Sequence, residues 1–368
     1  MSAVRITTAD GQSVAVTSTT DIIPAWASRY LGSWWTAERT TELYGPIVSA
    51  DLAEGELRGY ADVVEQRSPD TVEYAGAELL VAQDGDLITA VQDDRSLAYR
   101  WDPDFRLLRI VGTDETTLAA AAARLARELL RAQLLEDGWS ILHASAVTTT
   151  EGATILTLGD KGAGKTTTAL TLARAGWRLL ANDRVFARVD DGIVRVLPWP
   201  SAAAFGFGLL DALDLYETVR TRLASGEQMH PTQHQTVTDA LLDGRRTPLW
   251  KASGKGELKP QFWPDQLTSW LSMPLAAEGH VTGILFPQIT AGAEPRLIGG
   301  ARGVQDGDFF TAVTEDRYPD VFGLLPAPGD PTVLREHLDG LAHQGVLMSH
   351  DAAANALVLK EAVARLGA

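Results

Sequence analysis

The sequence predicts an α/β fold built around one strand–loop–helix unit, with a β-rich (α+β) domain before it and a helical segment after it. Three observations support this class. Short apolar runs separated by turn residues fill the first third of the chain, an alanine- and leucine-rich helix follows, and apolar strands then alternate with helices around a glycine-rich loop. We therefore predict an N-terminal domain over 1–135, a core domain over 136–330 and a C-terminal helical segment over 331–368.

Length and composition restrict the class of protein further. The chain has 368 residues, of which 45% are hydrophobic and 22% charged, as in a soluble globular protein of about two domains. Cysteine is absent, which excludes disulfides, thiolate–zinc sites and a cysteine nucleophile. The sequence has no apolar run of about 18 residues, and residues 1–10 lack the pattern of a signal peptide. We expect a cytoplasmic protein without a membrane span.

The formal net charge of −16 bears on the choice of partner. An average negative field repels DNA and RNA, so no nucleic-acid partner is expected. A small phosphorylated ligand remains compatible with this charge, because local backbone amides and one lysine can hold a phosphate in an acidic chain.

Two β-hairpins are predicted in the N-terminal domain, each from apolar runs around an Asp-Gly pair: 4–7 with 13–16, and 78–81 with 87–91. Residues 26–44 fit either a helix or irregular structure. Nothing in 1–135 indicates a ligand. Residues 114–136 form the clearest helix, because leucines recur at helical spacing and Asp137-Gly138 ends the run.

The core domain begins with two apolar stretches, 141–149 and 153–158, each predicted to be one strand. The later elements are a helix over 165–175, a strand over 177–181, a hairpin of 185–189 with 193–197, and a buried strand over 281–286. Residues 225–265 are polar and turn-rich, which predicts a long mobile loop or lid.

The glycine-rich loop has the spacing G-x-x-x-x-G-K-[ST] between a predicted strand and a predicted helix. Such a loop curls so that successive N–H groups face a phosphate, and the helix adds its positive end. Lys165 is expected to reach the β- and γ-phosphates of ATP and Thr166 to bind Mg²⁺. The predicted nucleotide-binding residues are Gly159, Asp160, Lys161, Gly162, Ala163, Gly164, Lys165, Thr166 and Thr167.

Lys161 is a second lysine in this loop, and its role stays open between a γ-phosphate contact and a solvated loop tip. In MinD-type ATPases an extra lysine stands five residues before the P-loop lysine. That position here is Asp160, so the sequence does not predict this class.

The core domain resembles the catalytic domain of HPr kinase/phosphorylase and its smaller kinase-like relatives. The resemblance covers about 140–290 and is carried by Leu142–Val147, Gly159–Thr166, Leu170–Gly176 and Trp177–Val185, in the order and with the gaps of the family. It implies a kinase that uses ATP and Mg²⁺. The full enzymes of the family form rings, which leaves a homo-oligomer open.

Two departures from the family narrow this expectation. The family's paired aspartates appear here as Asn182-Asp183, and an asparagine cannot accept a proton as general base. The family stretch E-I-R-G-x-G appears as 203–208, without its metal-binding glutamate and its arginine. Both departures argue against HPr as substrate. They favour the relatives that modify peptides or small molecules in biosynthesis.

Three side chains are candidates for the chemistry. Asp183 follows a predicted strand at the carboxyl edge of the sheet, where it would hold Mg²⁺ or orient the acceptor, unless it only caps a turn. His143 would polarise the acceptor hydroxyl, or else is an ordinary core histidine. Arg184 would stabilise the transferred charge, or else forms a surface ion pair.

The leading hypothesis is an ATP- and Mg²⁺-dependent kinase whose acceptor is a hydroxyl of a small molecule or peptide. Thr166 and Asp183 would bind the metal, while Lys165, Arg184 and His143 would act on the reacting groups. A basic run over 245–259 would grip an anionic acceptor or is a solvated face. Two alternatives stay open: a non-catalytic nucleotide-binding regulator or scaffold, and an ATPase without a phosphoacceptor.

Overall fold

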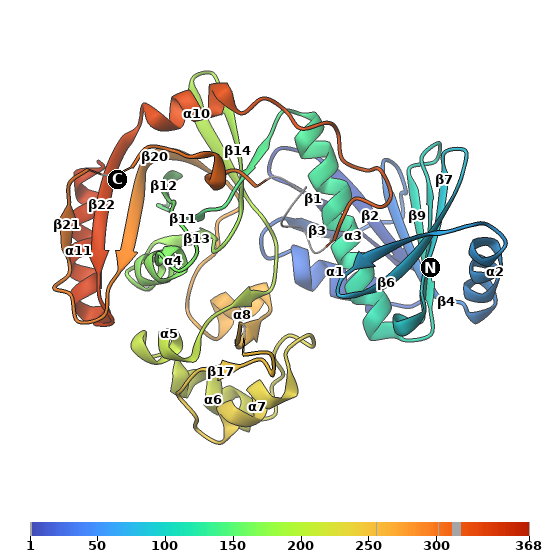
Figure 1. Ribbon diagram of the computed structural model, residues 1–368, viewed down its shortest axis with the longest axis horizontal. Coiled ribbons are helices and arrows are strands. Elements are labelled where there is room, and N and C mark those ends of the chain that lie inside the picture. Colours follow the sequence, from blue (N-terminus) through green and yellow to red (C-terminus); the bar gives the residue numbers. More distant parts are fainter. Residues whose placement is uncertain (1, 255, 301, 311–317, 368) are drawn as a thin grey trace. The chain divides into compact units, whose positions relative to one another are not determined.

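The computed structural model describes residues 2–254, 256–300, 302–310 and 318–367 and has mixed α/β architecture (Figure 1). Contacts between residues divide the chain into two compact units. The N-terminal unit comprises residues up to Trp139 together with 318–329, and the C-terminal unit comprises Ser140–Phe310 together with the residues from Asp330 onward. The unit boundaries therefore differ from the predicted domains, because 318–329 packs with the N-terminal unit.

The N-terminal unit is one mixed sheet in the strand order β3-β1-β2-β4-β9-β8-β7-β6-β5. Helices α1 and α3 pack on each other and on β2, and α2 packs on β7 and β8. The expected hairpins are present as β1–β2 and β6–β7, and residues 26–44 hold the end of α1 and strand β3. The elements are β1 (Ser2–Thr7), β2 (Ser13–Ser18), α1 (Ile22–Leu31), β3 (Thr36–Arg39), β4 (Ile47–Leu52), α2 (Glu54–Glu65), β5 (Asp70–Tyr74), β6 (Ala77–Asp84), β7 (Leu87–Gln92), η1 (Asp93–Arg95), β8 (Leu97–Asp102), β9 (Leu107–Gly112) and α3 (Glu115–Glu136).

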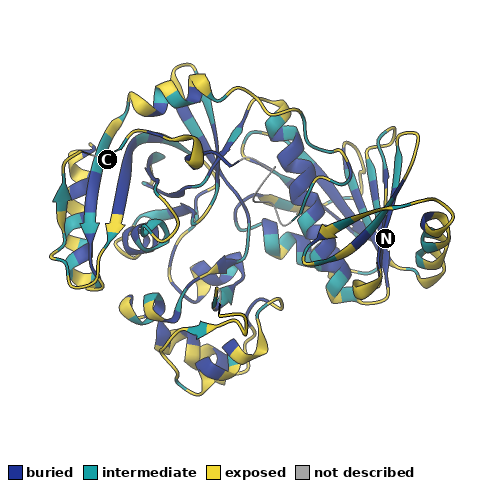
Figure 2. Ribbon diagram, in the orientation of Figure 1, coloured by how far each residue is buried: buried dark blue, intermediate teal, exposed yellow. Residues whose placement is uncertain are grey.

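Helix α3 is the central helix of this unit. It begins where the Asp114 side chain accepts a hydrogen bond from the Thr117 N–H, a common N-cap arrangement. Figure 2 shows α3 buried along most of its length, whereas α2 is mostly exposed. The alanines of α3 allow this close packing, because a small side chain lets strands and α1 approach the helix axis.

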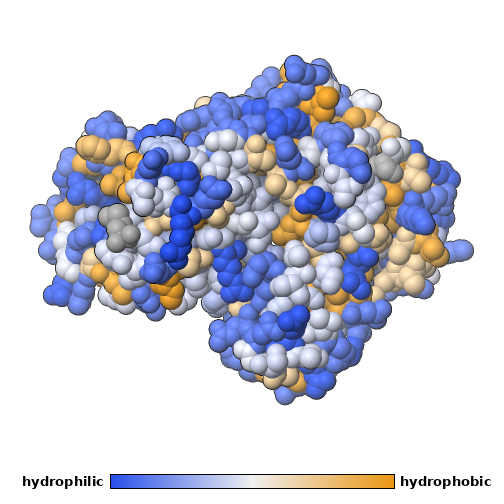
Figure 3. All heavy atoms as spheres, turned by 180° about the vertical axis from the view of Figure 1, so that it is seen from behind, coloured by the Kyte–Doolittle hydropathy of each residue, from blue (hydrophilic) through white to orange (hydrophobic). Residues whose placement is uncertain are grey.

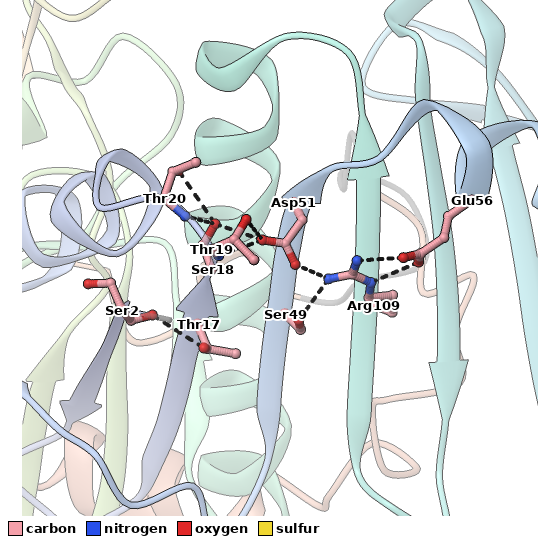
Figure 4. Close-up of polar contacts among 9 residues, drawn as sticks. All are labelled: Ser2, Thr17, Ser18, Thr19, Thr20, Ser49, Asp51, Glu56 and Arg109. Carbon is pink, nitrogen blue, oxygen red and sulfur yellow. Dashed lines mark hydrogen bonds and ion pairs between the residues drawn. The ribbon is translucent and has the colours of Figure 1, made fainter.

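A partly buried polar cluster joins the end of β2 to strands β4 and β9 and helix α2 of the N-terminal unit (Figure 4). The Asp51 carboxylate on β4 accepts hydrogen bonds from the Thr19 N–H at 2.6 Å and the Ser18 hydroxyl at 3.1 Å. It also pairs with Arg109 of β9, whose guanidinium in turn reaches Glu56 of α2 at 2.9 Å. Burial alone would raise the pKa of Asp51, but the Thr19 hydrogen bonds and Arg109 hold it below its ordinary value.

The C-terminal unit contains a second sheet, in the order β10-β14-β15-β20-β12-β11-β13, with β22 beside β20 and β21 beside β22. Strand β12 runs parallel to β20, and β20 runs parallel to β22. Helix α4 packs on β11, β12 and β13, helix α11 packs on α4 and β22, and α10 packs on β14 and β15. The elements are β10 (Ser140–Leu142), β11 (Ser145–Thr148), β12 (Ala153–Thr157), α4 (Lys165–Arg174), β13 (Arg178–Ala181), β14 (Val185–Asp190), β15 (Ile193–Pro198), β20 (Gly279–Ile289), β21 (Arg296–Ile298), η2 (Asp306–Asp308), α10 (Thr332–Asp339), β22 (Ala342–Met348) and α11 (Ala352–Arg365).

The stretch 141–149, predicted as one strand, is divided into β10 and β11. Strand β10 pairs with β14, whereas β11 lies between β12 and β13. The chain leaves the ladder at His143, whose N–H donates to the Asp308 carbonyl at 2.7 Å. Contact with a segment far along the chain thus interrupts a continuous apolar run.

The described residues of 203–271 form a compact insertion of helices and short strands, so 225–265, predicted as a long mobile loop or lid, is not one continuous loop. Its centre is aromatic: Phe205 stacks on Phe262 with ring centroids 5.4 Å apart, and Trp263 and Trp270 are buried beside them. The elements are β16 (Ala203–Ala204), α5 (Phe207–Ala212), α6 (Tyr216–Ala224), α7 (Gln235–Leu242), β17 (Leu249–Trp250), β18 (Glu257–Leu258), β19 (Gln261–Phe262) and α8 (Pro264–Ser269).

The segment 331–368, predicted to be helical, also contains the strand β22. This strand pairs along its whole length with β20, from Ala342 to Met348. The last part of the chain therefore completes the sheet of the C-terminal unit. The one face drawn in Figure 3 has hydrophobic residues in small patches among hydrophilic ones. Among the described residues, no helix combines the length and apolar character that a membrane span requires.

Candidate functional site

The glycine-rich loop connects the end of β12 to the start of α4, the context that the sequence predicts. Gly164 immediately precedes the helix with φ 109°, a conformation that L side chains rarely adopt. A Cβ atom on Gly164 would also lie 2.8 Å from the Ile289 side chain and 2.9 Å from the Met348 side chain. Glycine is therefore required here twice, for backbone conformation and for close packing on β20 and β22.

The first turn of α4 presents backbone donors to the loop. The Thr168 N–H donates to the Gly164 carbonyl at 2.9 Å, which is the first hydrogen bond of the helical ladder. The amides of residues 165–167 precede that bond, and helical geometry offers them no intrahelical acceptor. They lie at the positive end of the helix dipole, where an anion is stabilised.

Lys165 folds back over the loop. Its ammonium donates to the Gly159 carbonyl at 2.6 Å and to the Asp160 carbonyl at 3.4 Å. Burial lowers the pKa of Lys165, and the charges of Asp183, Asp308 and Asp160 oppose that shift. The Lys165 ammonium is thus partly shielded from water and interacts with the charges of three carboxylates.

Thr166 and Asn182 bring the second strand end into the site. Since β11 is antiparallel to both β12 and β13, these two strands run in the same direction and end at the same edge of the sheet. The Thr166 hydroxyl donates to the Asn182 carbonyl at 3.2 Å. Asp183 is the next residue, and its side chain is 67% exposed. Of the two residues that the sequence predicts as metal ligands, Thr166 therefore contacts the residue directly before Asp183 in the chain.

Arg184 and His143 meet at Phe310. The Arg184 guanidinium lies 3.9 Å from the centre of the Phe310 ring, and the His143 ring contacts the same phenylalanine edge-on at 5.1 Å. Arg184 is also 3.8 Å from the Asp183 carboxylate. The Arg184 and His143 side chains are therefore held by one aromatic ring, and the largely exposed Asp183 contacts Arg184.

Two residues of the site are missing from the sequence-based prediction. Arg302 donates two hydrogen bonds of 2.6 Å to the Asp308 carboxylate, whose side chain is 4% exposed. Both charges act on Lys165. No motif marks this pair, since it lies on an irregular segment before α10. The backbone contact of Asp308 with His143 also links the pair to the predicted site.

Other predicted contributors lie elsewhere. Lys161 is exposed at the loop tip. In the basic run, Arg246 pairs with Asp211 and Glu217 within the insertion; Lys255 lies outside the described residues. That arrangement agrees with a solvated face held by local ion pairs.

The described residues include no group of three or more His, Asp or Glu side chains arranged to hold a metal. A Mg²⁺ ion bound through one or two protein ligands and a phosphate does not require such a group. Neither a comparison with models of known protein families nor a comparison with curated proteins gave a match. The geometry of this site is therefore the basis for the function proposed below.

Proposed function

We propose that the chain is an ATP- and Mg²⁺-dependent kinase that transfers the γ-phosphate to a hydroxyl of a small molecule or peptide. The observation that carries the proposal is that, at the carboxyl ends of β12 and β13, Thr166 contacts Asn182 while the charge of the adjacent Asp183 acts on Lys165. Ligand sites of open α/β sheets lie at this edge.

The residues of the site suit both the phosphates of ATP and the Mg²⁺ ion. The unbonded amides of the α4 N-terminus and the Lys165 ammonium suit the phosphates. The Thr166 hydroxyl and the Asp183 carboxylate are oxygen ligands of the kind that Mg²⁺ prefers. The Lys165 ammonium donates its hydrogen bonds to loop carbonyls. A phosphate oxygen could replace these carbonyls as the acceptor without a change in the backbone.

In the proposed reaction the acceptor oxygen bonds to the γ-phosphorus while the bond from that phosphorus to the bridging oxygen breaks, and ADP leaves. Lys165 would offset the charge that develops on the bridging oxygen. Asp183 would orient the acceptor and take the hydroxyl proton directly or through water. His143 and Arg184, fixed on Phe310, would position groups on the acceptor side.

The test is a product assay on the full chain. The protein is incubated with ATP and Mg²⁺, and ADP is measured with and without a panel of hydroxylated acceptors. Acceptor-dependent ADP that is lost in Lys165→Ala and kept in Lys360→Ala, an exposed lysine on α11, supports the kinase. No ADP under any condition would overturn it.

A nucleotide-binding regulator is the second candidate. Asn182 favours it, because the position next to Asp183 lacks the carboxylate of the resembling family. Tight ATP binding without ADP formation would identify this function. Formation of ADP that no acceptor accelerates would instead identify an ATPase.

A further inference from the structure

A cavity of about 370 Å³ lies beside the first two turns of α4. It is lined from four directions: by Thr167 and Thr171 of α4, by Leu209 and Leu213 of the α5 region, by Ile289 at the end of β20, and by Ser349 after β22. All these elements belong to the C-terminal unit. The volume is within the range of small-molecule sites, about 300–1,000 Å³.

The chemistry of the walls points to an uncharged occupant. None of the described residues that line the cavity is an Asp, Glu, Lys or Arg, and much of the lining is aliphatic. The charged groups of the site lie instead around Lys165. A ligand that occupies both the glycine-rich loop and the cavity would therefore place its charged part at the loop. The part in the cavity would be mostly apolar, with polar atoms at its edge.

One polar atom in the wall has no partner. The Thr171 hydroxyl is buried, with 4% of the residue exposed, and it makes no hydrogen bond to any described residue. A buried hydroxyl without a partner costs free energy, which a ligand bond would recover once the Thr171 side chain rotates its oxygen into the cavity. Thr167 and Thr171 are four residues apart, so both side chains lie on the same face of α4.

The cavity and Asp183, where the proposed acceptor hydroxyl would lie, are on opposite sides of β12 in the sheet. In the strand order β13-β11-β12-β20, with β22 next to β20, Asp183 follows β13 on one side of β12. Ile289 and Ser349 lie at the ends of β20 and β22 on the other side. Thr167 connects the cavity to the proposed phosphate and metal site, because it lines the cavity and directly follows Thr166.

From this arrangement we infer that the cavity binds the base and sugar end of the nucleotide, with the base against Leu209, Leu213 and Ile289 and one of its ring or exocyclic nitrogens hydrogen-bonded to Thr171. This inference rests on the proposed triphosphate site. It assigns to the same ligand a second, uncharged subsite, and it assigns the acceptor to the opposite side of β12.

The experiment compares two probes by calorimetry on the full chain with Mg²⁺: a non-hydrolysable ATP analogue and inorganic tripolyphosphate. Ala212 is exposed and lines the cavity, so Ala212→Trp fills the space from the surface. Ala353→Trp, at an exposed alanine of α11 outside the lining, is the matched control. The wild type should bind the ATP analogue at least about tenfold more tightly than tripolyphosphate. Ala212→Trp should remove that difference and Ala353→Trp should keep it.

Thr171→Val removes the hydroxyl at nearly constant shape. It should weaken the ATP analogue by about five- to tenfold, the effect of one hydrogen bond, and leave tripolyphosphate unchanged. Equal melting temperatures of the variants and the wild type confirm that the fold is intact.

The possible failures separate the two proposals. If the wild type binds neither probe, the triphosphate site is wrong and the cavity assignment falls with it. If the wild type binds both and Ala212→Trp and Thr171→Val leave the analogue's affinity unchanged, the triphosphate site stands and the cavity assignment is wrong. An effect of Ala212→Trp on the KM of the acceptor alone would assign the cavity to the acceptor and overturn the inference.

Discussion

The hydroxyl of Thr166 donates a 3.2 Å hydrogen bond to the backbone carbonyl of Asn182, and this contact joins the glycine-rich loop to the end of β13. Because the acceptor is a backbone oxygen, the side chain at position 182 does not determine where Thr166 lies. An asparagine in place of a carboxylate therefore leaves the geometry of the loop intact and changes only the chemistry. Asp183 remains as the acidic side chain next to this contact.

Asp183→Asn should reduce acceptor-dependent turnover by about 100-fold or more, because it removes the proposed metal ligand and proton acceptor. Its side chain is 67% exposed, so the melting temperature should stay that of the wild type. Initial rates across a Mg²⁺ titration provide the measurement. Asp191→Asn, at an exposed turn aspartate, is the control. Full activity of Asp183→Asn would remove Asp183 from the metal site.

Lys165→Met should abolish turnover and at the same time raise the melting temperature near neutral pH. Burial lowers the pKa of Lys165 below 10.5, so the folded state releases this proton more readily than the unfolded state. The charged lysine therefore costs stability at pH values below its folded pKa, and the cost fades as the pH rises toward 10.5. Thermal melts at pH 7 and pH 10 test the sign: the advantage of the variant should shrink at the higher pH.

Arg302→Ala should destabilise the C-terminal unit by about 2–3 kcal/mol, since it leaves the buried Asp308 carboxylate without its bidentate partner. Adding Asp308→Asn to that variant should recover part of the loss, because the unpaired charge is then gone. Urea unfolding of the two single variants and the double variant measures the coupling. Additive losses would show that the pair contributes no interaction energy.

Asp51→Asn should destabilise the N-terminal unit by about 2 kcal/mol at pH 7, through loss of the Arg109 pair and weaker acceptance of the Thr19 hydrogen bonds. The pKa of Asp51 is lowered in the folded state, so its contribution is complete above 3.8 and is lost as the pH falls through the folded pKa. The difference from the wild type should therefore narrow below pH 3.8. Asp84→Asn, which breaks an exposed pair with Arg67, should have little effect.

Several elements could be predicted from short stretches of sequence alone. The Asp-Gly hairpins, the helix after Asp114 and the strand–loop–helix unit follow from turn chemistry, capping and periodicity, and the structure confirms each of them. Asp183 could be placed near Thr166 because both follow strand ends in a motif with known spacing.

Long-range contacts determine the features that the sequence did not predict. The break between β10 and β11 at His143 depends on a hydrogen bond to the Asp308 carbonyl. Asp308 is far along the chain, so the sequence around position 143 does not indicate this break. Residues 225–265 have the composition of a loop, yet a few buried aromatic side chains, such as Phe262 and Trp263, are enough to form a satellite core. Strand β22 lies between two helices and its first residues, Ala342 to Gln344, are not an apolar run, so its pairing with β20 is what reveals it.

The order of residues along the chain has a consequence for biosynthesis. The N-terminal unit needs residues 318–329, where Tyr318 packs on Tyr74 and Phe322 packs on Tyr99, and the sheet of the C-terminal unit needs β22. Both pieces leave the ribosome after almost everything else. Neither unit can reach its final packing during most of translation, and the close packing of Gly164 against Ile289 and Met348 forms only at the end. Until then a nascent chain of this protein would have a C-terminal sheet without β22 and an N-terminal unit without the Tyr318 and Phe322 contacts, and we expect it to depend on chaperones during synthesis.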